Sequence, residues 1–317
     1  MNVPAPRFLP LLLFLFFGSG CAALIYEIVW LQMLQLVIGS SAVSIAVLLG
    51  TFMGGMCAGS LALPRFVTAS HHPLRVYAWL ELGIAATALI INYAMPAIGS
   101  LYSALVGHGM PGIALRALVG MICLLPPTML MGATLPAISR WIETTPRGIS
   151  WLGFFYGGNT LGAVAGCLLA GFYLLRVHDS TTATLYAAGL NVAVGLVSLH
   201  LAHLAPYRAP AASPIEASRL SVRSMQERRV LAVLALSGLC ALAAEVVWTR
   251  ILSLLVGATV YTFSIILAVF LVGIGAGSSA GAAFARHAPN PRFALAGCQV
   301  LQTAALAWAA HVMSNVL

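Results

Sequence analysis

Two glutamates inside apolar stretches are the residues of this sequence best suited to chemistry. Glu27 and Glu245 are each followed three residues later by a tryptophan, Trp30 and Trp248. On a helix this spacing places carboxyl group and indole on one face, where together they can hold an ammonium group. The pattern predicts a binding site for a small cation. The alternatives are plain packing of the tryptophans and a structural role for the glutamates, either paired with Arg250 or bonded while protonated to a neighbouring helix.

Three further polar residues are predicted to contribute to binding. Glu81 lies in the third apolar stretch, and an ionisable group within hydrocarbon costs about 2.5–3.5 kcal/mol, so it needs a partner or a function. Asn159 is the second candidate, with a hydrogen bond between helices as the alternative. Pro126-Pro127 predicts a broken helix whose freed backbone groups need partners such as Thr128 and Thr134, of which Thr134 is the third candidate. The alternative is a packing kink satisfied by serine or threonine.

Other chemistries find no support in the sequence. The six cysteines are dispersed without a Cys-x-x-Cys pair, so neither a metal site nor a disulfide is predicted. Glycine stripes such as Gly158-xxx-Gly162-xxx-Gly166 predict close helix packing, not phosphate binding. His71 and His72 are expected to be solvated loop residues. No catalytic residue and no cofactor is predicted.

The composition identifies the elements that must position these side chains. Of the 317 residues, 61% are hydrophobic and only 7% are charged, whereas a soluble domain carries about 25% charged residues. Soluble enzymes, nucleic-acid-binding proteins and disulfide-stapled domains are therefore excluded. The sequence predicts an all-α, polytopic helical membrane protein whose main partner is the lipid bilayer. Nine spans are expected near 8–37, 42–63, 76–95, 113–138, 149–175, 181–204, 229–256, 258–285 and 293–315.

The arginines predict the orientation of these spans. All 15 basic residues are arginine, and 12 of them fall on one side if the N-terminus is cytoplasmic. These 12 are Arg7, Arg65, Arg75, Arg140, Arg147, Arg208, Arg219, Arg223, Arg228, Arg229, Arg286 and Arg292. Because cytoplasmic loops are enriched in basic residues, the pattern predicts a multi-pass protein of the plasma (inner) membrane with a cytoplasmic N-terminus.

An internal repeat divides the chain. Residues 19–60 match residues 237–278 at an offset of 218, with 16 identities in 42 positions, and Glu81 falls opposite Gln299. Six spans separate the copies, so both run in the same direction, as in the parallel halves of major-facilitator transporters. The predicted organisation is 1–204, a first six-helix repeat; 205–228, a cytoplasmic linker rich in Arg and Pro; and 229–317, three helices of a second repeat. This second half is incomplete, which implies either truncation or a partner that completes it.

Four segments carry a resemblance to a known family. They are Ser19-Gly20…Leu24-Ile25-Tyr26-Glu27…Trp30, Pro127-Thr128-Met129-Leu130-Met131-Gly132-Ala133-Thr134-Leu135-Pro136, Asn159-Thr160-Leu161-Gly162-Ala163…Gly166 and Ala188-Gly189-Leu190-Asn191. Together they resemble the membrane, transporter-like half of bacterial fused spermidine-synthase-like multi-pass proteins. The resemblance implies association with an aminopropyltransferase-like domain. The chain has neither a Gly-Gly-Gly-Asp-Gly loop nor the paired aspartates of such a domain, and Gln32 stands where the family has arginine, so no enzymatic activity is carried over.

Three functions are consistent with these patterns. The leading hypothesis is a transporter or binder of a small cation, with a polyamine as the first guess. The second is a membrane anchor or scaffold for a separately encoded aminopropyltransferase-like domain or a larger membrane complex. The third is a part of a membrane-bound enzyme whose catalytic domain lies elsewhere.

Overall fold

The regular structure of the chain is helical throughout the part that the computed structural model describes. That part comprises residues 8–38, 42–68, 70–105, 110–142, 148–205, 207, 225–257, 259–287 and 291–316. The helices of the first repeat copy are α1 (Leu9–Ile38), α2 (Ala42–Phe66), α3 (Pro73–Leu105), α4 (Met110–Ile142), α5 (Gly148–Leu169), the π-helical turn η2 (Ala170–Leu174), α6 (Leu175–Val177) and α7 (Ser180–Leu204). Those of the second are α9 (Met225–Val256), α10 (Val260–His287) and α11 (Pro291–Val316).

Nine of the described helical segments are long and apolar enough to cross a bilayer. They are Leu9–Leu36, Ser44–Phe66, Pro73–Met95, Leu118–Trp141, Phe154–Val177, Ser180–Leu204, Arg228–Val256, Val260–Gly281 and Arg292–Asn315. Each coincides with one of the nine predicted spans, so the multi-pass helical class is confirmed. Most of the predicted linker 205–228 lies outside the described residues.

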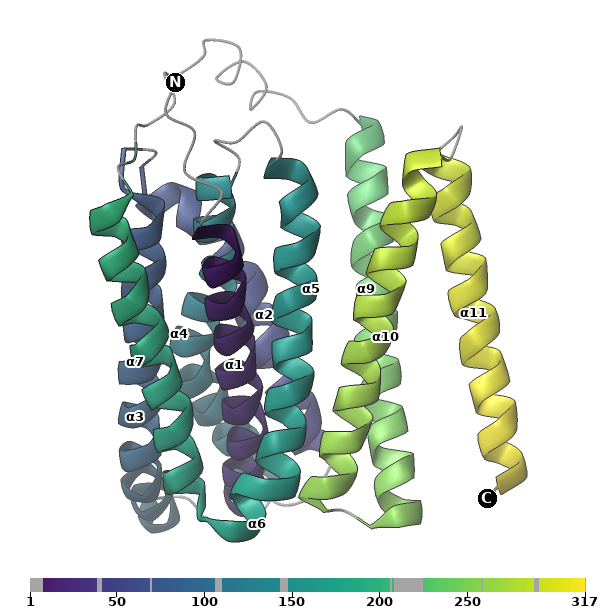
Figure 1. Ribbon diagram of the computed structural model, residues 1–317. Coiled ribbons are helices and arrows are strands. Elements are labelled where there is room, and N and C mark those ends of the chain that lie inside the picture. The colour runs from purple at the N-terminus through teal and green to yellow at the C-terminus, as the bar shows by residue number, and fades with distance from the viewer. Residues whose placement is uncertain are drawn as a thin grey trace.

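The first repeat copy is a bundle built around α1 (Figure 1). Helices α5 and α7 pack along α1, α2 packs on α4, and α3 lies against α4 and α7. The second copy lies on the α5 side of this bundle, where α10 packs on α5 and α9 reaches α2. Helix α11 forms the outer edge, and α1 and α9 begin on the same side of the molecule (Figure 1). The two copies therefore run in the same direction.

Glycine stripes allow the backbones within the first copy to approach closely, as predicted. A Cβ added at Gly162 or Gly166 of α5 would overlap the carbonyl oxygen of Phe17 or Cys21 on α1. Gly132 of α4 meets the backbone of α2 in the same manner. Small residues let membrane helices gain contact area that larger side chains would prevent. These contacts fix the position of α1 and hence of its polar residues.

The predicted break in the fourth span is wrong. Helix α4 continues from Met110 to Ile142 with Pro126, Pro127 and Pro136 inside it. The Thr128 hydroxyl, directly after the Pro126-Pro127 pair, donates to the carbonyl oxygens of Leu124 and Leu125 at 2.8 and 3.0 Å and so adds side-chain hydrogen bonds within this turn of the helix. Close packing on α2, through Gly55 against Thr128, holds the segment in place.

The prediction for His72 is also wrong. The imidazole stacks on Trp141 with ring centroids 5.5 Å apart, contacts the Tyr207 ring at 5.6 Å, and donates from Nε2 to the carbonyl oxygen of Ala205 at 2.8 Å. His72 therefore ties the start of α3 to the ends of α4 and α7. By contrast, His71 is exposed and bonds only to the nearby Thr68.

This burial predicts a pH dependence of stability. Desolvation lowers the pKa of His72 below its ordinary value of 6.5, against the opposing effect of the bond to Ala205 and with smaller lowering effects from Arg75 and His203. The unfolded chain therefore binds a proton more readily, so stability from this residue is present above pH 6.5 and is lost as the pH falls below it. We expect a smaller fall in melting temperature between pH 7.5 and 5.5 for His72→Gln than for the wild type. His71→Gln is the matched control, and equal falls in all three proteins would contradict the prediction.

Candidate functional site

Glu27 and Glu245 come together where the two repeat copies meet. Glu27 on α1 is 1% exposed and Glu245 on α9 is 4% exposed, and the two carboxyl groups interact electrostatically. The repeat predicts that the two glutamates occupy equivalent places, and that they face one cavity if the two halves are arranged as in major-facilitator transporters. Because burial removes water that would screen the two groups, each is sensitive to the charge of the other.

The wall opposite Glu27 is formed by α5 and α10. Cys167 on α5 lies within electrostatic range of Glu27 and donates from Sγ to the carbonyl oxygen of Ser264 on α10 at 3.1 Å. Four residues later, Gly171 lies so close to Ser264 that an added Cβ would overlap the serine side chain. The glycine thus lets α10 reach the level of Glu27.

The backbone of this wall is irregular. Residues Ala170–Leu174 form the π-helical turn η2, which contacts α1, α7 and α10. A π-turn inserts one residue into a helix and changes the direction in which the following side chains point; such turns are frequent at functional sites. The turn contains Gly171 and begins three residues after Cys167, which makes it part of the site.

Several buried polar atoms at this junction have no hydrogen-bond partner within the described part of the chain. They come from α1, α2, α9 and α10, helices that contact one another around the junction. The atoms are Glu27 Oε1, Trp30 Nε1, Thr51 Oγ1, Thr249 Oγ1 and Ser264 Oγ, whereas the Tyr26 hydroxyl, which also has no described partner, lies within electrostatic range of Glu81. A buried polar group without a partner costs about 1–3 kcal/mol, so a concentration of them indicates a position that water or a polar ligand occupies.

The two tryptophans differ in their surroundings. Trp30 is fully buried, stacks on Tyr26 with ring centroids 5.3 Å apart, and lies 6.4 Å from the Phe52 ring. Trp248 is only partly buried. Trp30 therefore packs among aromatic rings, as in the alternative interpretation of the Glu-x-x-Trp pattern, and its indole nitrogen has no hydrogen-bond partner among the described residues.

Glu81 belongs to a different cluster. Ser19 of α1 donates to Glu81 Oε1 at 2.6 Å, and the Asn191 amide of α7 donates to Glu81 Oε2. The cluster therefore links α1, α3 and α7, and both carboxyl oxygens are engaged by the protein itself. Ser19 precedes Glu27 by eight residues, or about 12 Å along a helix. This geometry favours a structural role for Glu81.

Asn159 and Thr134 also bond within the protein. Asn159 donates to the carbonyl oxygen of Phe16 at 3.1 Å, beside Gly20 of α1, about two turns before Glu27. The Thr134 hydroxyl donates to the carbonyl oxygen of Met131 in its own helix at 2.7 Å. No described hydrogen bond brings either side chain to the two glutamates. Both residues stabilise helices that surround the site.

The charged side chains around the glutamates provide neither a counter-ion nor a set of metal ligands. Within the described ranges, no ion pair joins Arg250 to Glu27 or Glu245, and Arg250 is only partly buried. Within the same ranges, His, Cys, Asp and Glu side chains do not form any group of three or more that could hold a metal ion. The carboxyl pair is thus unneutralised by any described side chain.

Sequence reasoning missed Cys167, Thr249, Ser264 and the π-turn. Thr249 and Ser264 stand where the first repeat copy has Leu31 and Ala46, so the repeat gave no signal for them. These two differences between the repeat copies could themselves have indicated Thr249 and Ser264, because the second copy has a polar residue in place of an apolar one at only a few positions.

Comparisons of the chain with protein-family models, with curated proteins and with solved structures give no match. The chain is a multi-pass helical membrane protein with a buried carboxyl pair between two copies of an internal repeat.

Proposed function

We propose that this protein binds a small organic cation at the Glu27–Glu245 pair and moves it across the membrane, with a polyamine as the first substrate to test. The observation that carries the proposal is the buried Glu27 Oε1, which has no partner among the described residues although Glu245 lies within electrostatic range. Two neighbouring acidic groups without a described counter-ion favour an added positive charge.

The chemistry of the surrounding atoms fits a primary ammonium group. An ammonium has three donors and no acceptor, so it needs oxygen atoms around it. The unpartnered hydroxyl oxygens of Thr249 and Ser264 and the carboxyl oxygen of Glu27 are such acceptors. A diamine has one ammonium for each carboxyl group, which supports a polyamine over a monovalent inorganic ion.

A change of access to this site needs a deformable element. The π-turn at Ala170–Leu174 lies between Cys167 and the extracellular end proposed for α5, and it contacts both α1 and α10. Conversion of a π-turn to an α-helix rotates the residues that follow it, which would alter the packing of α5 on α10. The orientation assumed here, with a cytoplasmic N-terminus of an inner-membrane protein, is supported by the arginine distribution.

Substitution of either glutamate is expected to abolish stabilisation by polyamine. Purified protein in detergent is melted with putrescine or spermidine and with inorganic salt of equal ionic strength. A ligand at 100 times its dissociation constant adds about 2.7 kcal/mol to the native state. We expect this polyamine-specific increase in the wild type and its loss in Glu27→Gln and Glu245→Gln.

Two controls separate loss of binding from loss of fold. Asp179→Asn removes a negative charge at the N-cap of α7, away from the glutamate pair, and keeps a side chain that can cap the helix, so its polyamine response should equal that of the wild type. Without ligand, Glu27→Gln and Glu245→Gln should melt no lower than the wild type, because each relieves repulsion between the two acidic groups. A folded wild type that responds to polyamine no more than to salt would refute the proposal.

A scaffold is the second candidate function. The most apolar windows of α9 and α11 are 6% and 0% buried, against 39–61% for the six spans of the first copy. Such exposed membrane helices favour assembly with a larger membrane complex. An aminopropyltransferase-like subunit is the partner that the sequence resemblance suggests, and its co-purification with this protein from native membranes, unaffected by Glu27→Gln, would favour this function over transport.

A further inference from the structure

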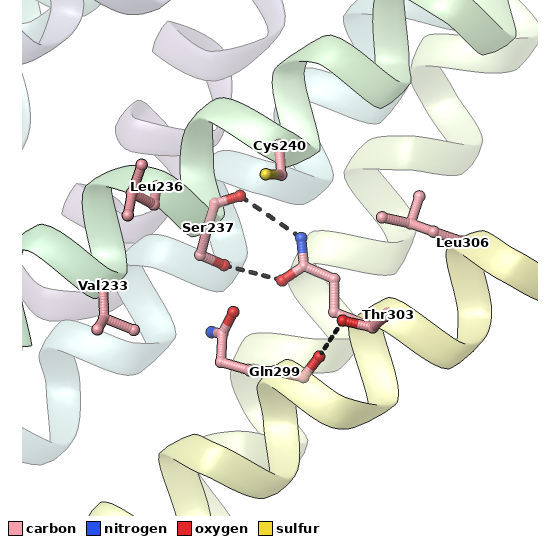
Figure 2. Close-up of a pocket in the computed structure, with 8 residues that line it drawn as sticks. Val233, Leu236, Ser237, Cys240, Gln299, Thr303 and Leu306 are labelled. Atoms are coloured by element: carbon pink, nitrogen blue, oxygen red, sulfur yellow. Dashed lines mark hydrogen bonds between the residues drawn. The ribbon is translucent and has the colours of Figure 1, made fainter.

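A cleft lies between α9 and α11 in the second repeat copy (Figure 2). Its volume is about 270 Å³, and we call it the α9–α11 groove. Its lining consists of Val233, Leu236, Ser237, Cys240, Gln299, Gln302, Thr303 and Leu306. Ser237 donates to Gln302 Oε1 at 2.8 Å, and Gln302 Nε2 donates back to the Ser237 carbonyl oxygen at 3.5 Å. The groove therefore combines apolar walls with a polar centre that joins the two helices.

The repeat identifies what this groove corresponds to in the first copy. Subtracting the offset of 218 from the lining positions gives Leu15, Gly18, Ser19, Ala22, Glu81, Ile84, Ala85 and Ala88. Every one of these residues is buried. In the groove, by contrast, Val233 is 41% exposed and Leu236 is 62% exposed. The same surface is thus covered in one copy and open in the other. Helices α3 and α11 also begin with equivalent prolines, Pro73 and Pro291.

Helix α7 is what covers the surface in the first copy. It packs on both α1 and α3. Its Leu190 and Val194 lie against Gly18, and its Asn191 donates to Glu81, which already accepts a hydrogen bond from Ser19. The serine that joins α1 to α3 has the same position in the repeat as Ser237, which joins α9 to α11. The serine is thus common to both copies, but its partner differs: Glu81 is equivalent to Gln299, whereas Gln302 stands where the first copy has Ile84. The amide that completes the polar centre in the first copy comes from α7.

We propose that the α9–α11 groove is the seat of a transmembrane helix from a membrane partner, with the chemistry of α7: a small apolar face and one amide side chain. The amide reaches Gln299 and Gln302 as Asn191 reaches Glu81. Because Leu236 stands where the first copy has Gly18, the helix carries alanine or glycine where α7 has Leu190 and Val194. This inference does not depend on the proposed transport function.

A defined peptide tests the proposal on the intact protein in liposomes. The probe has the α7 sequence, residues 180–204, with Leu190→Ala and Val194→Ala to admit Leu236 and Ala187→Cys to report its position. Leu190 and Val194 of α7 lie against Gly18, and α7 runs antiparallel to α1 (Figure 1). Ala187, about one turn before Leu190, is therefore expected at the level of Ala22, about one turn after Gly18 and the equivalent of Cys240. Mild oxidation should therefore link the peptide to Cys240. The exposed Cys57 and Cys298 are internal controls on other faces.

The expected result is a disulfide to Cys240 at least tenfold more abundant than disulfides to Cys57 or Cys298. Interhelical hydrogen bonds in membranes are worth about 0.6–1.7 kcal/mol, which corresponds to a threefold to about 15-fold change in affinity. We expect a loss of that size when the peptide also carries Asn191→Leu, and again when the protein carries Ser237→Leu with Gln302→Leu. The peptide substitution leaves the protein unchanged, so misfolding of the protein variant cannot imitate it.

Two outcomes would overturn the proposal. Equal linkage to all three exposed cysteines would show that the groove is an ordinary lipid-facing surface. A disulfide between Cys240 residues of two copies, formed without peptide and preventing peptide linkage, would show that a second copy of this chain occupies the groove.

Discussion

Gly162→Ala will lower the free energy of unfolding by about 3 kcal/mol, an effect at the upper end of those seen for overpacked sites. The added methyl group would overlap the carbonyl oxygen of Phe17 and also crowd the carbonyl carbon and Cα of that residue. All three atoms belong to the backbone, so no side chain can rotate away. Helix α5 would have to move off α1, which would disturb the contacts of both helices. Thermal or denaturant-induced unfolding in detergent would measure the loss.

The same helix provides a matched control. A Cβ added at Gly157 would meet nothing within 4 Å. Gly157→Ala should therefore leave stability unchanged or raise it slightly, because alanine favours the helix over glycine by up to about 1 kcal/mol. Equal melting temperatures of Gly162→Ala and Gly157→Ala would show that close backbone packing between α1 and α5 is not what stabilises the bundle.

Glu81→Ala will lower the free energy of unfolding by about 2–5 kcal/mol. The substitution removes the acceptor for Ser19 and for Asn191, each of which stays buried, and an unsatisfied buried group costs about 1–3 kcal/mol. The contacts that tie α1, α3 and α7 together at this level would be lost. Glu81→Gln should lose less, since its amide oxygen can still accept one of the two hydrogen bonds. Unfolding without any ligand measures both.

Thr87 on the same helix provides a control that separates loss of the Glu81 cluster from any destabilisation of α3 itself. Thr87 bonds only to carbonyl oxygens of its own helix, those of Gly83 and Ile84. Thr87→Ala should change the unfolding free energy by less than about 1 kcal/mol. Were Glu81→Ala as stable as Thr87→Ala but unable to respond to polyamine, Glu81 would be a binding residue and not a structural one.

The nine spans and the pairing of Glu27 with Glu245 could be predicted from the sequence. A bilayer demands long apolar runs, so hydropathy alone locates the spans. A repeat with an even number of spans between its copies places equivalent helices in the same direction. Equivalent glutamates become neighbours only if the two copies face each other. The structure supplies that condition, because Glu27 and Glu245 interact.

The remaining features depend on packing that the sequence does not encode locally. Prolines predict a break, yet α4 continues as a helix, and its backbone packs closely on α2 through Gly55, Gly59 and Gly132. The residues around His72 in the sequence are those of a loop between two spans. Only the folded chain brings Trp141 and Tyr207 to its ring. The π-turn likewise depends on how α5 meets α1 and α10. Tertiary contacts decide all three.

The walls of the site are synthesised at very different times, because α1 lies near the start of the sequence and α9 and α10 follow more than 180 residues later. Cys167, which lies within electrostatic range of Glu27, donates a hydrogen bond to Ser264 on α10. Ser264 follows Glu27 in the sequence by 264 − 27 = 237 residues. At about 5–20 residues per second, translation takes roughly 12–47 s to reach it. A carboxyl-bearing helix thus enters the membrane long before the last wall of its site exists. The junction closes only when α9 and α10 insert, so a defect in their insertion would leave an already folded bundle with Glu27 directed towards lipid.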